Sequence, residues 1–413
     1  MIFRLLRLNP DNVQHRNAYY LVIELFWAGI LGSAGTFNAA FVLHLEATNT
    51  DIGYLSSIPA LLAVVVSLPA GRFLQKRAKR TPWILWALFI NRLSYLLLAV
   101  IPWLHWLHLP LGSVVVWFLV ISTIPAHFFN VGWYALIAEA VDARSRAGLV
   151  TARMMIASAT TALFSFLFGL MLSWIAFPYN YALMYVIGFS ASMVSMVCLL
   201  KLKIPDAVPV ISQPGTRFNL ARVRQAMAEH PGLTRIIINT FLHGLGLWLA
   251  GPLYILRYVR QLHATDAWIG LASTVAMLAG ILATPIWQRV MTHWGRSATL
   301  KRTIVLIGLF PIAAGLSPSL TLILFAVAFN NLIAPGVNLS HFTTLLDVTP
   351  EENRPGYTSW YISLVNTGAF VAPMLGVIIA NQLGIGTTLV ICGVLSILGS
   401  TSFWWHPVKD EKA

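Results

Sequence analysis

Glu24 is the residue of this sequence with the most distinctive chemistry, because it is a carboxylate inside a long apolar run, 17–45. Every other carboxylate falls in a polar segment or near the end of an apolar run. A buried carboxylate can carry a proton, bind a cation or pair with a buried base. Arg92 lies at a comparable depth in the run 82–104 and is the candidate base. The sequence leaves three roles open for Glu24: proton carrier, cation ligand or partner of Arg92.

Further polar residues recur at helical spacing inside four of the apolar runs. Residues three, four or seven positions apart share one face of a helix. Because polar groups are costly in hydrocarbon, such a face is expected to line a water-filled or binding cavity, or to join helices by hydrogen bonds. The candidate cavity residues are Glu24, Asn38, His127, Asn130, Tyr134, Asn239, His243, Asn331 and Asn338.

The composition requires that these residues be carried by helices in a membrane. Hydrophobic residues make up 58% of the chain, charged residues 10%, and the mean hydropathy is +0.74. A spanning helix needs about 20 mostly apolar residues. Twelve runs meet this length, and the sequence therefore predicts an all-α integral membrane protein with twelve transmembrane helices. The runs are 17–45, 52–73, 82–104, 112–138, 148–175, 180–201, 235–259, 267–290, 302–317, 319–343, 357–380 and 385–405.

The chain also contains a long internal repeat. The segment LEATNTDIGY at 45–54 returns as LHATDAWIGL at 262–271, and each copy stands between two apolar runs. Further along, Asn130 matches Asn338, and Glu139 is answered by Asp347. A repeat of this length in an apolar chain indicates two fused six-helix halves. We expect bundles at 1–202 and 235–413, joined by a cytoplasmic linker at 203–234.

The net charge of +13 is explained by membrane topology rather than by a nucleic-acid partner. If residue 1 is cytoplasmic, all Lys and Arg residues except Arg92, Arg257 and Arg260 fall in cytoplasmic segments or at cytoplasmic helix ends. This asymmetry follows the positive-inside rule. It predicts a multi-pass protein of the cell (inner) membrane with both termini in the cytoplasm. Membrane lipids are the expected counter-charge, and the basic segment 218–230 is either a simple tether or a helix on the membrane surface.

Twelve spans in two parallel repeats, with basic loops after spans 2 and 8, resemble the major facilitator superfamily. The family motif G-x-x-x-D-R-x-G-R-[RK] has its counterpart in Gly71 to Arg80, where Gln75 replaces the Asp and Ala78 the second Gly. Gly295 and Arg296 preserve the end of the second copy. The resemblance implies two pseudo-symmetric bundles, a central cavity lined by spans 1, 4, 7 and 10, and a cytoplasmic gate.

The missing motif Asp removes one residue that helps to close this gate in the family. Charged residues at the inner ends of spans 4 and 10 could replace it, as the pairs Glu139 with Arg146 and Asp347 with Arg354. The alternative is that these residues are ordinary charges that stabilise helix ends. The candidate gate residues are Gly71, Gln75, Lys76, Lys79, Arg80, Glu139, Arg146, Gly295, Arg296, Asp347 and Arg354.

These features predict a secondary transporter that moves a small organic solute by alternating access, with proton coupling through Glu24 as one possibility. A lipid or lysolipid flippase on the same scaffold is the alternative. The sequence contains no carboxylate cluster for a metal and diphosphate, no HExxH or GxSxG motif, and no GxxxxGK[ST] loop. We therefore expect no enzyme activity, no cofactor and no metal, and we expect a monomer. Drug antiporters of the superfamily often carry Gly-Pro-Gly in span 5, but 148–175 contains no proline.

Overall fold

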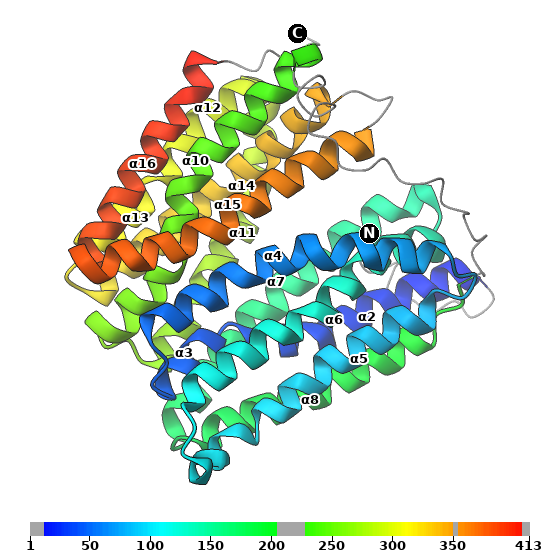
Figure 1. The fold of residues 1–413 in the computed structure, drawn as a ribbon. Coiled ribbons are helices and arrows are strands. Elements are labelled where there is room, and N and C mark those ends of the chain that lie inside the picture. The colour runs from blue at the N-terminus through cyan, green and yellow to red at the C-terminus, as the bar shows by residue number, and fades with distance from the viewer. Residues whose placement is uncertain (1–11, 205–227, 350–353, 407–413) are drawn as a thin grey trace. The chain divides into compact units, whose positions relative to one another are not determined.

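The computed structural model describes residues 12–204, 228–349 and 354–406, and within these ranges the chain is helical with no strand. The basic segment 218–230 lies almost wholly outside them. The chain forms two compact units, which are treated separately (Figure 1). Unit 1 comprises Met1–Thr48, Leu62–Gln213 and Thr265–Met277, and unit 2 comprises Asn49–Leu61, Pro214–Ala264 and Leu278–Ala413.

Twelve helical segments in the described ranges are long and apolar enough to cross a membrane, which confirms the predicted fold class. Each coincides with one predicted run, and most boundaries differ by a few residues. The segments are Val13–His44, Asn49–Gln75, Thr81–Leu98, Leu111–Trp133, Gly148–Trp174, Tyr179–Leu200, Pro231–Gln261, Asp266–Trp294, Arg296–Leu316, Leu320–Val348, Trp360–Leu383 and Ile385–Trp405.

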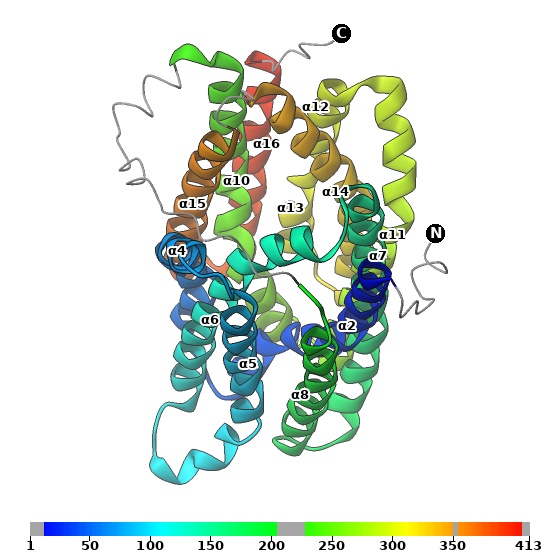
Figure 2. The ribbon, with the colours of Figure 1, turned by 90° about the vertical axis from the view of Figure 1, so that its right-hand side faces the viewer.

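Unit 1 is built around its first helix. This helix, α2 (Val13–Gly35), packs along α7 (Ala143–Trp174) and α8 (Tyr179–Leu200). On the other side of α8 lies α5 (Thr81–Leu98), which also packs against α6 (Leu111–Ala140) (Figure 2). The unit also holds α3 (Asn38–His44), the 3-10 helix η1 (Ile101–Leu107) and most of α4 (Asn49–Gln75).

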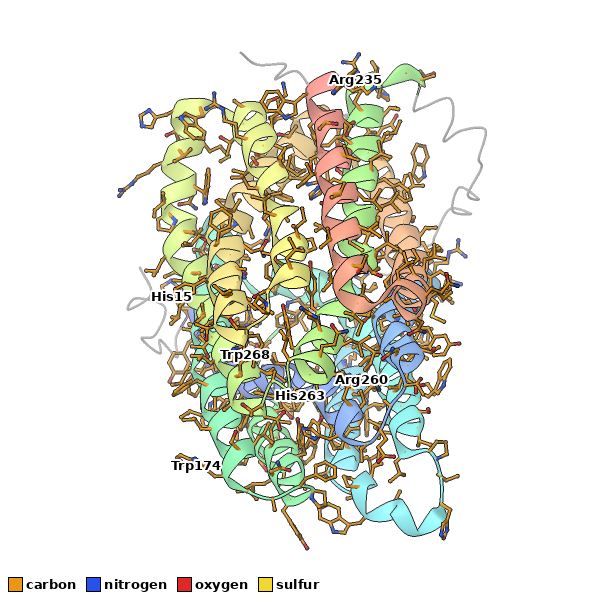
Figure 3. All side chains as sticks on the ribbon, turned by 90° about the vertical axis from the view of Figure 1, so that its left-hand side faces the viewer. His15, Trp174, Arg235, Arg260, His263 and Trp268 are labelled. Atoms are coloured by element: carbon orange, nitrogen blue, oxygen red, sulfur yellow. The ribbon has the colours of Figure 1, made fainter. Side chains whose placement is uncertain are left out.

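Unit 2 has the corresponding arrangement around α10 (Pro231–Leu256), which packs along α15 (Arg354–Leu383) and α16 (Ile385–Trp405). Arg235 and Arg260 mark the two ends of this span (Figure 3). The remaining helices are the π-helical segment η2 (Arg257–Gln261), α11 (Asp266–Trp294), whose first turns belong to unit 1, α12 (Arg296–Ile307), α13 (Leu309–Leu316) and α14 (Leu320–Val348).

Two predicted runs, the first and the ninth, are each divided into two α-helices. The first span bends at Thr36 and Phe37, directly after Gly35, and the ninth is divided at Gly308. Glycine is a common site of such bends because it lacks a side chain to support the helix. The third span ends at Leu98, earlier than predicted, and continues as η1. Hydropathy could locate these spans, but it does not report bends.

Helices α4 and α11 show that the sequence repeat is also a structural repeat. The residues that precede them, Glu46 and His263, both have left-handed backbone conformations, with φ of 62° and 53°. In unit 2, a Cβ at Gly53 of α4 would lie 3.2 Å from the Val377 side chain of α15. In unit 1, a Cβ at the matching Gly270 of α11 would overlap the backbone of α7. Repeat-related glycines therefore permit repeat-related close contacts.

Replacing Gly270 with alanine is expected to lower the thermal unfolding midpoint of the purified protein, because the new Cβ would collide with the Ser165 carbonyl oxygen. Overpacking of this kind costs about 1–3 kcal/mol. Gly280→Ala on the same helix is the matched control, since no atom lies within 4 Å of its Cβ and alanine favours helix by about 1 kcal/mol. Equal midpoints for the two variants would contradict the close contact.

Candidate functional site

Glu24 lies in unit 1 between two arginines, in the middle of the first span. Its Oε2 is 3.0 Å from Nη1 of Arg153, and its Oε1 is 3.7 Å from Nη2 of Arg92. The Ser195 hydroxyl donates a hydrogen bond of 2.8 Å to Oε1. All three charged residues are buried, with exposed fractions of 4% for Glu24, 3% for Arg92 and 8% for Arg153. We call Glu24, Arg92 and Arg153 the charge cluster.

Both guanidinium groups are fixed by further contacts within unit 1. Arg92 donates to the Ser192 carbonyl oxygen at 2.5 Å and to the Ser195 hydroxyl at 2.8 Å. Arg153 donates to the Leu21 carbonyl oxygen, and its guanidinium carbon lies 4.7 Å from the centre of the Trp133 ring. The cluster therefore joins α2, α5, α7 and α8, with an aromatic side chain of α6 beside it.

The geometry of Glu24 is the one expected of a buried ion pair, extended by a second arginine. With its carboxylate and two guanidiniums ionised, the charge cluster carries one surplus positive charge. The sequence interpretation missed Arg153 because it placed this residue at a cytoplasmic helix end. In the structure α7 begins at Ala143, and Asp142 caps it by accepting from the Ser145 amide at 3.0 Å. Recognising this N-cap would have placed Arg153 several turns inside the helix.

Asn38, the second polar residue of the first span, joins helices of unit 1. Its Oδ1 accepts a hydrogen bond of 3.0 Å from the Tyr185 hydroxyl, and its side chain also bonds with Tyr95. These contacts connect α3 with α8 and α5. Asn38 therefore has the contacts of an interhelical link, which the sequence had left open beside a cavity role.

The polar residues of the fourth and tenth spans are arranged differently. Asn130 on α6 and Asn338 on α14 are repeat-related, and both are exposed within the described structure. His127 is half-buried, and the side chain of Tyr134 lies outside the described residues. Asn331 donates to the Val327 carbonyl oxygen of its own helix at 2.9 Å. Among the expected stripe residues whose side chains the structure describes, the two repeat-related asparagines are the ones in the exposed class.

Asn239 and His243 in unit 2 both connect α10 to the C-terminal end of the chain. Asn239 donates to the His406 carbonyl oxygen at 3.1 Å. His243 Nδ1 lies 2.8 Å from the Ser400 hydroxyl and 3.1 Å from the Ser396 hydroxyl. Both side chains are buried, with exposed fractions of 0% and 6%. His243 therefore holds α10 against α16, and Asn239 holds α10 against His406, the residue that follows α16.

Sequence reasoning missed a second polar cluster in unit 2. The Thr240 hydroxyl oxygen lies 2.7 Å from Nε2 of His341, and the His341 and Tyr361 rings have centroids 6.0 Å apart. These residues come from α10, α14 and α15. The available signal was the position of His341 three residues after Asn338, which continues the polar stripe of the tenth span.

Repeat-related ion pairs occur among the candidate gate residues. Arg80 Nη1 lies 3.4 Å from Glu139 Oε1 in unit 1, and Arg296 pairs with Asp347 in unit 2. The carboxylates therefore pair with the motif arginines after spans 2 and 8. Arg146 instead donates to the Val141 carbonyl oxygen at 3.3 Å, and the side chain of Arg354 lies outside the described residues.

The other candidate gate residues surround these ion pairs or shape the chain beside them. In unit 1, Lys79, Arg80, Thr81 and Glu139 help to line a cavity of about 170 Å³. Gln75, Lys76 and Lys79 are exposed, and Gly71 approaches Val131. In unit 2, Gly295 precedes α12 with φ of 79°, a conformation that favours glycine.

Comparison with known proteins agrees with this architecture. The family model described as the Major Facilitator Superfamily matches residues 236–413. The multidrug resistance protein MdtG of Serratia proteamaculans is 25% identical over 194 residues, covering 42% of this chain and 46% of the relative. MdtG of Citrobacter koseri is 25% identical over 196 residues, covering 44% and 47%. The chain thus matches these curated relatives over about half of their length.

Solved transporter structures match nearly the whole chain. A POT family transporter in complex with 5-aminolevulinic acid has a TM-score of 0.73 at 12% identity, covering 96% of this chain and 97% of that one. A bacterial homolog of the human lysosomal transporter Spinster has a TM-score of 0.68 at 12% identity, covering 96% and 98%. The nucleoside transporter NupG has 0.65 at 13%, covering 94% and 98%. At these identities the likeness establishes the fold.

The loss of thermal stability caused by a substitution in the charge cluster is expected to depend on the net charge that the substitution leaves there. Glu24→Gln should lower the thermal unfolding midpoint more than Arg92→Gln or Arg153→Gln, because it leaves two buried guanidiniums without a counter-charge. Removing one partner of a buried ion pair costs about 3–5 kcal/mol. Arg72→Gln, at an exposed position of α4, is the control. If Glu24→Gln were as stable as the wild type, the carboxylate would not be the required counter-charge.

Proposed function

Since the chain belongs to the Major Facilitator Superfamily, we propose that it is a secondary transporter that moves a small organic solute across the membrane by alternating access. It is a multi-pass membrane protein and not an enzyme. In this mechanism two six-helix bundles expose a site near the middle of the membrane first to one side and then to the other.

The exposure of Asn130 and Asn338 within their spans is the main support for the proposed transport function. Each lies ten residues before the end of its helix, α6 or α14, and hence roughly 15 Å along the helix axis from that end. An amide at such a depth is costly if it faces lipid. Its occurrence at repeat-related positions supports, in each unit taken by itself, a polar surface open to water or solute, and we call these two surfaces the polar path.

The class of solute is inferred from the two exposed asparagines and from the polar cluster of Thr240, His341 and Tyr361. Asparagine amides, the hydroxyls of Thr240 and Tyr361, and aromatic rings suit an amphipathic organic molecule that presents both apolar surface and hydrogen-bonding groups. The matched relatives are named multidrug resistance proteins, which favours drug-like amphipathic compounds as the first class to examine. The lack of a proline in the fifth span sets this chain apart from drug antiporters that carry Gly-Pro-Gly there.

The charge cluster is assigned a structural role in this proposal. Proton carriage by Glu24 would require the carboxylate to give up two arginine partners and the Ser195 hydroxyl during each cycle. A permanent ion pair instead holds α2, α5, α7 and α8 together and leaves proton coupling to another group. The stability order of the Glu24 and arginine variants separates these two roles.

The end of unit 1 that carries Arg80 and Glu139 and the end of unit 2 that carries Arg296 and Asp347 are each proposed to be cytoplasmic. This orientation follows the positive-inside rule and places both termini in the cytoplasm of an inner-membrane protein. The ion pairs Arg80–Glu139 and Arg296–Asp347 then contribute to the cytoplasmic gate in place of the motif Asp. Because these groups are partly exposed, each pair is expected to contribute about 1 kcal/mol or less to the stability of the closed gate. A contribution of this size allows the contact to break and re-form. We propose that the monomer is the transporting unit.

A lipid substrate is the second candidate, and an apolar crevice of unit 2 favours it. The crevice, of about 540 Å³, lies between α10, α15 and α16. Its lining is almost wholly apolar, and Leu242, Val371 and Leu398 in it are between 41% and 60% exposed. Such a crevice could admit an acyl chain. Stabilisation of the protein by a single lipid headgroup class, together with lipid translocation in vesicles, would place this candidate first.

The test of the proposed transport function combines ligand-induced thermal shifts with flux into proteoliposomes, using amphipathic fluorescent dyes in cationic, neutral and anionic forms. A dye that binds the folded protein raises its unfolding midpoint. Asn130→Leu and Asn338→Leu are expected to weaken this binding about three- to tenfold, corresponding to the loss of one hydrogen bond. They should also reduce flux while leaving the unfolding midpoint without dye nearly unchanged.

The control is Asn91→Leu, because Asn91 donates to the Ser122 carbonyl oxygen at 2.9 Å and so joins α5 to α6. It should lower the midpoint without dye and leave the dye-induced shift in place. The polar path would be contradicted if Asn130→Leu and Asn338→Leu preserved dye binding and flux, or if they were destabilising in the manner of Asn91→Leu.

A further inference from the structure

A second cluster of titratable groups lies at the end of unit 1 where the first span finishes. The carboxylate of Asp266 accepts a hydrogen bond of 2.7 Å from the Tyr181 hydroxyl, and its other oxygen lies 3.2 Å from Nε2 of His44. The His44 ring stacks on Phe177, with centroids 5.7 Å apart. We call His44, Asp266 and Tyr181 the distal cluster, because it lies at the opposite end of the spans from Arg80 and Glu139.

The local structure fixes the carboxylate and leaves the imidazole accessible. Asp266 is in the first turn of α11, where the helix dipole favours a negative charge. The close contact of Gly270 with α7 holds this turn against unit 1. Asp266 is 9% exposed and Tyr181 is wholly buried, whereas the His44 side chain is 44% exposed. A proton from water can therefore reach His44, and its charge acts directly on a buried carboxylate.

We propose that the distal cluster is a proton-binding site, and that protonation of His44 locks α3, α8 and α11 together at this end of the molecule. The assignment of this lock to transport rests on the function proposed above. His44 and Tyr181 belong to the first sequence repeat and Asp266 to the second. In an alternating-access cycle the contact must therefore break when the distal side opens, and binding a proton to His44 opposes that opening.

Other titratable groups lie on or beside the elements that carry the distal cluster. Tyr185, one turn along α8 from Tyr181, is buried and bonds with Asn38. Glu46 and His263 are exposed in the segments that precede α4 and α11. Asp266 is the carboxylate that lies within ion-pairing distance of His44 among the described residues. Protonation of His44 strengthens this contact, and loss of the proton weakens it.

Helix α8 provides a physical connection from the distal cluster to the charge cluster. Tyr181, Tyr185, Ser192 and Ser195 recur at spacings of four, seven and three residues and so share one helix face. The two tyrosines bond Asp266 and Asn38, and the two serines bond Arg92. A displacement of α8 when the distal side opens would therefore change the contacts of both the distal cluster and the charge cluster.

The repeat-related contact in unit 2 lacks a titratable acid. Asn49, which matches Asp266 in the repeat, donates to Asn381 Oδ1 at 2.8 Å and accepts from Arg260. No proton is expected to control this contact, because an amide does not titrate and arginine remains charged in proteins. Of the two repeat-related contacts, the distal cluster alone is expected to respond to pH.

The test is hydrogen exchange of the substrate-free, full-length protein in lipid nanodiscs at about pD 5.5 and 8, corrected for the intrinsic pH dependence of amide exchange. Peptides that cover 36–48 and 262–272 report on α3 and the start of α11. In the wild type, their corrected exchange should be about two- to fivefold slower under acid conditions, the effect expected of one partly exposed ion pair. Both His44→Gln and Asp266→Asn should remove this difference.

His108→Gln is the matched control, since His108 is exposed on the segment that follows η1. It should retain the acid protection. Protection that persists in His44→Gln, or that is lost in His108→Gln, would overturn the proposal. Tyr181→Phe keeps the ion pair and should preserve the pH dependence while raising exchange at both pD values. Because the measurement uses no solute, its failure would leave the transport proposal standing, and failure of dye flux would leave the proton site standing.

Discussion

The ionic contact of Glu24 with Arg92 and Arg153 is the interaction on which the structure of unit 1 depends. Three charged groups in a segment that crosses hydrocarbon are stable only if each has a partner and the remaining hydrogen-bonding positions are filled. The serines of α8 and the Leu21 carbonyl oxygen meet this second requirement. The cluster thereby fixes the relative positions of α2, α5, α7 and α8. Helix α6, which carries Asn130, meets these helices through Trp133, whose ring lies 4.7 Å from the Arg153 guanidinium carbon.

In the described part of unit 2, hydrogen bonds rather than an ion pair join the helices that correspond to α2 and α8. The pair α10 and α16 occupies the place in the second repeat that α2 and α8 occupy in the first. His243 with Ser396 and Ser400 joins this pair, where Glu24 with Ser195 joins the other. The glycine contacts of α4 and α11 and the ion pairs at the basic end occur in both repeats. Duplication has therefore preserved the packing frame, while the buried polar groups and the distal contacts have diverged.

Hydropathy and repeat spacing predicted the helical class, the twelve spans and the relation between the two halves, because each of these follows from length and apolarity. They also selected Glu24, Asn130 and Asn338 as residues at unusual depth. They did not reveal Arg153, because its depth depends on an N-cap lying outside the apolar run, or the partners of Glu139 and Asp347, which come from other helices. Pairings of this kind depend on tertiary geometry, to which a one-dimensional pattern is insensitive.

Asn130 and Asn338 are each proposed to face water or solute within their own unit, and the accessibility of a cysteine at each position to a polar reagent measures this exposure. Single cysteines at these positions, in a protein whose buried Cys198 and Cys392 are replaced by alanine, are treated with a small, charged, membrane-impermeant thiol reagent. A cysteine at Val65, an apolar position of α4 that is 57% exposed, is the comparison for a lipid-facing site. The cysteines at positions 130 and 338 are expected to react, and the cysteine at position 65 is expected not to react. Equal lack of reaction at all three positions would contradict the proposed exposure.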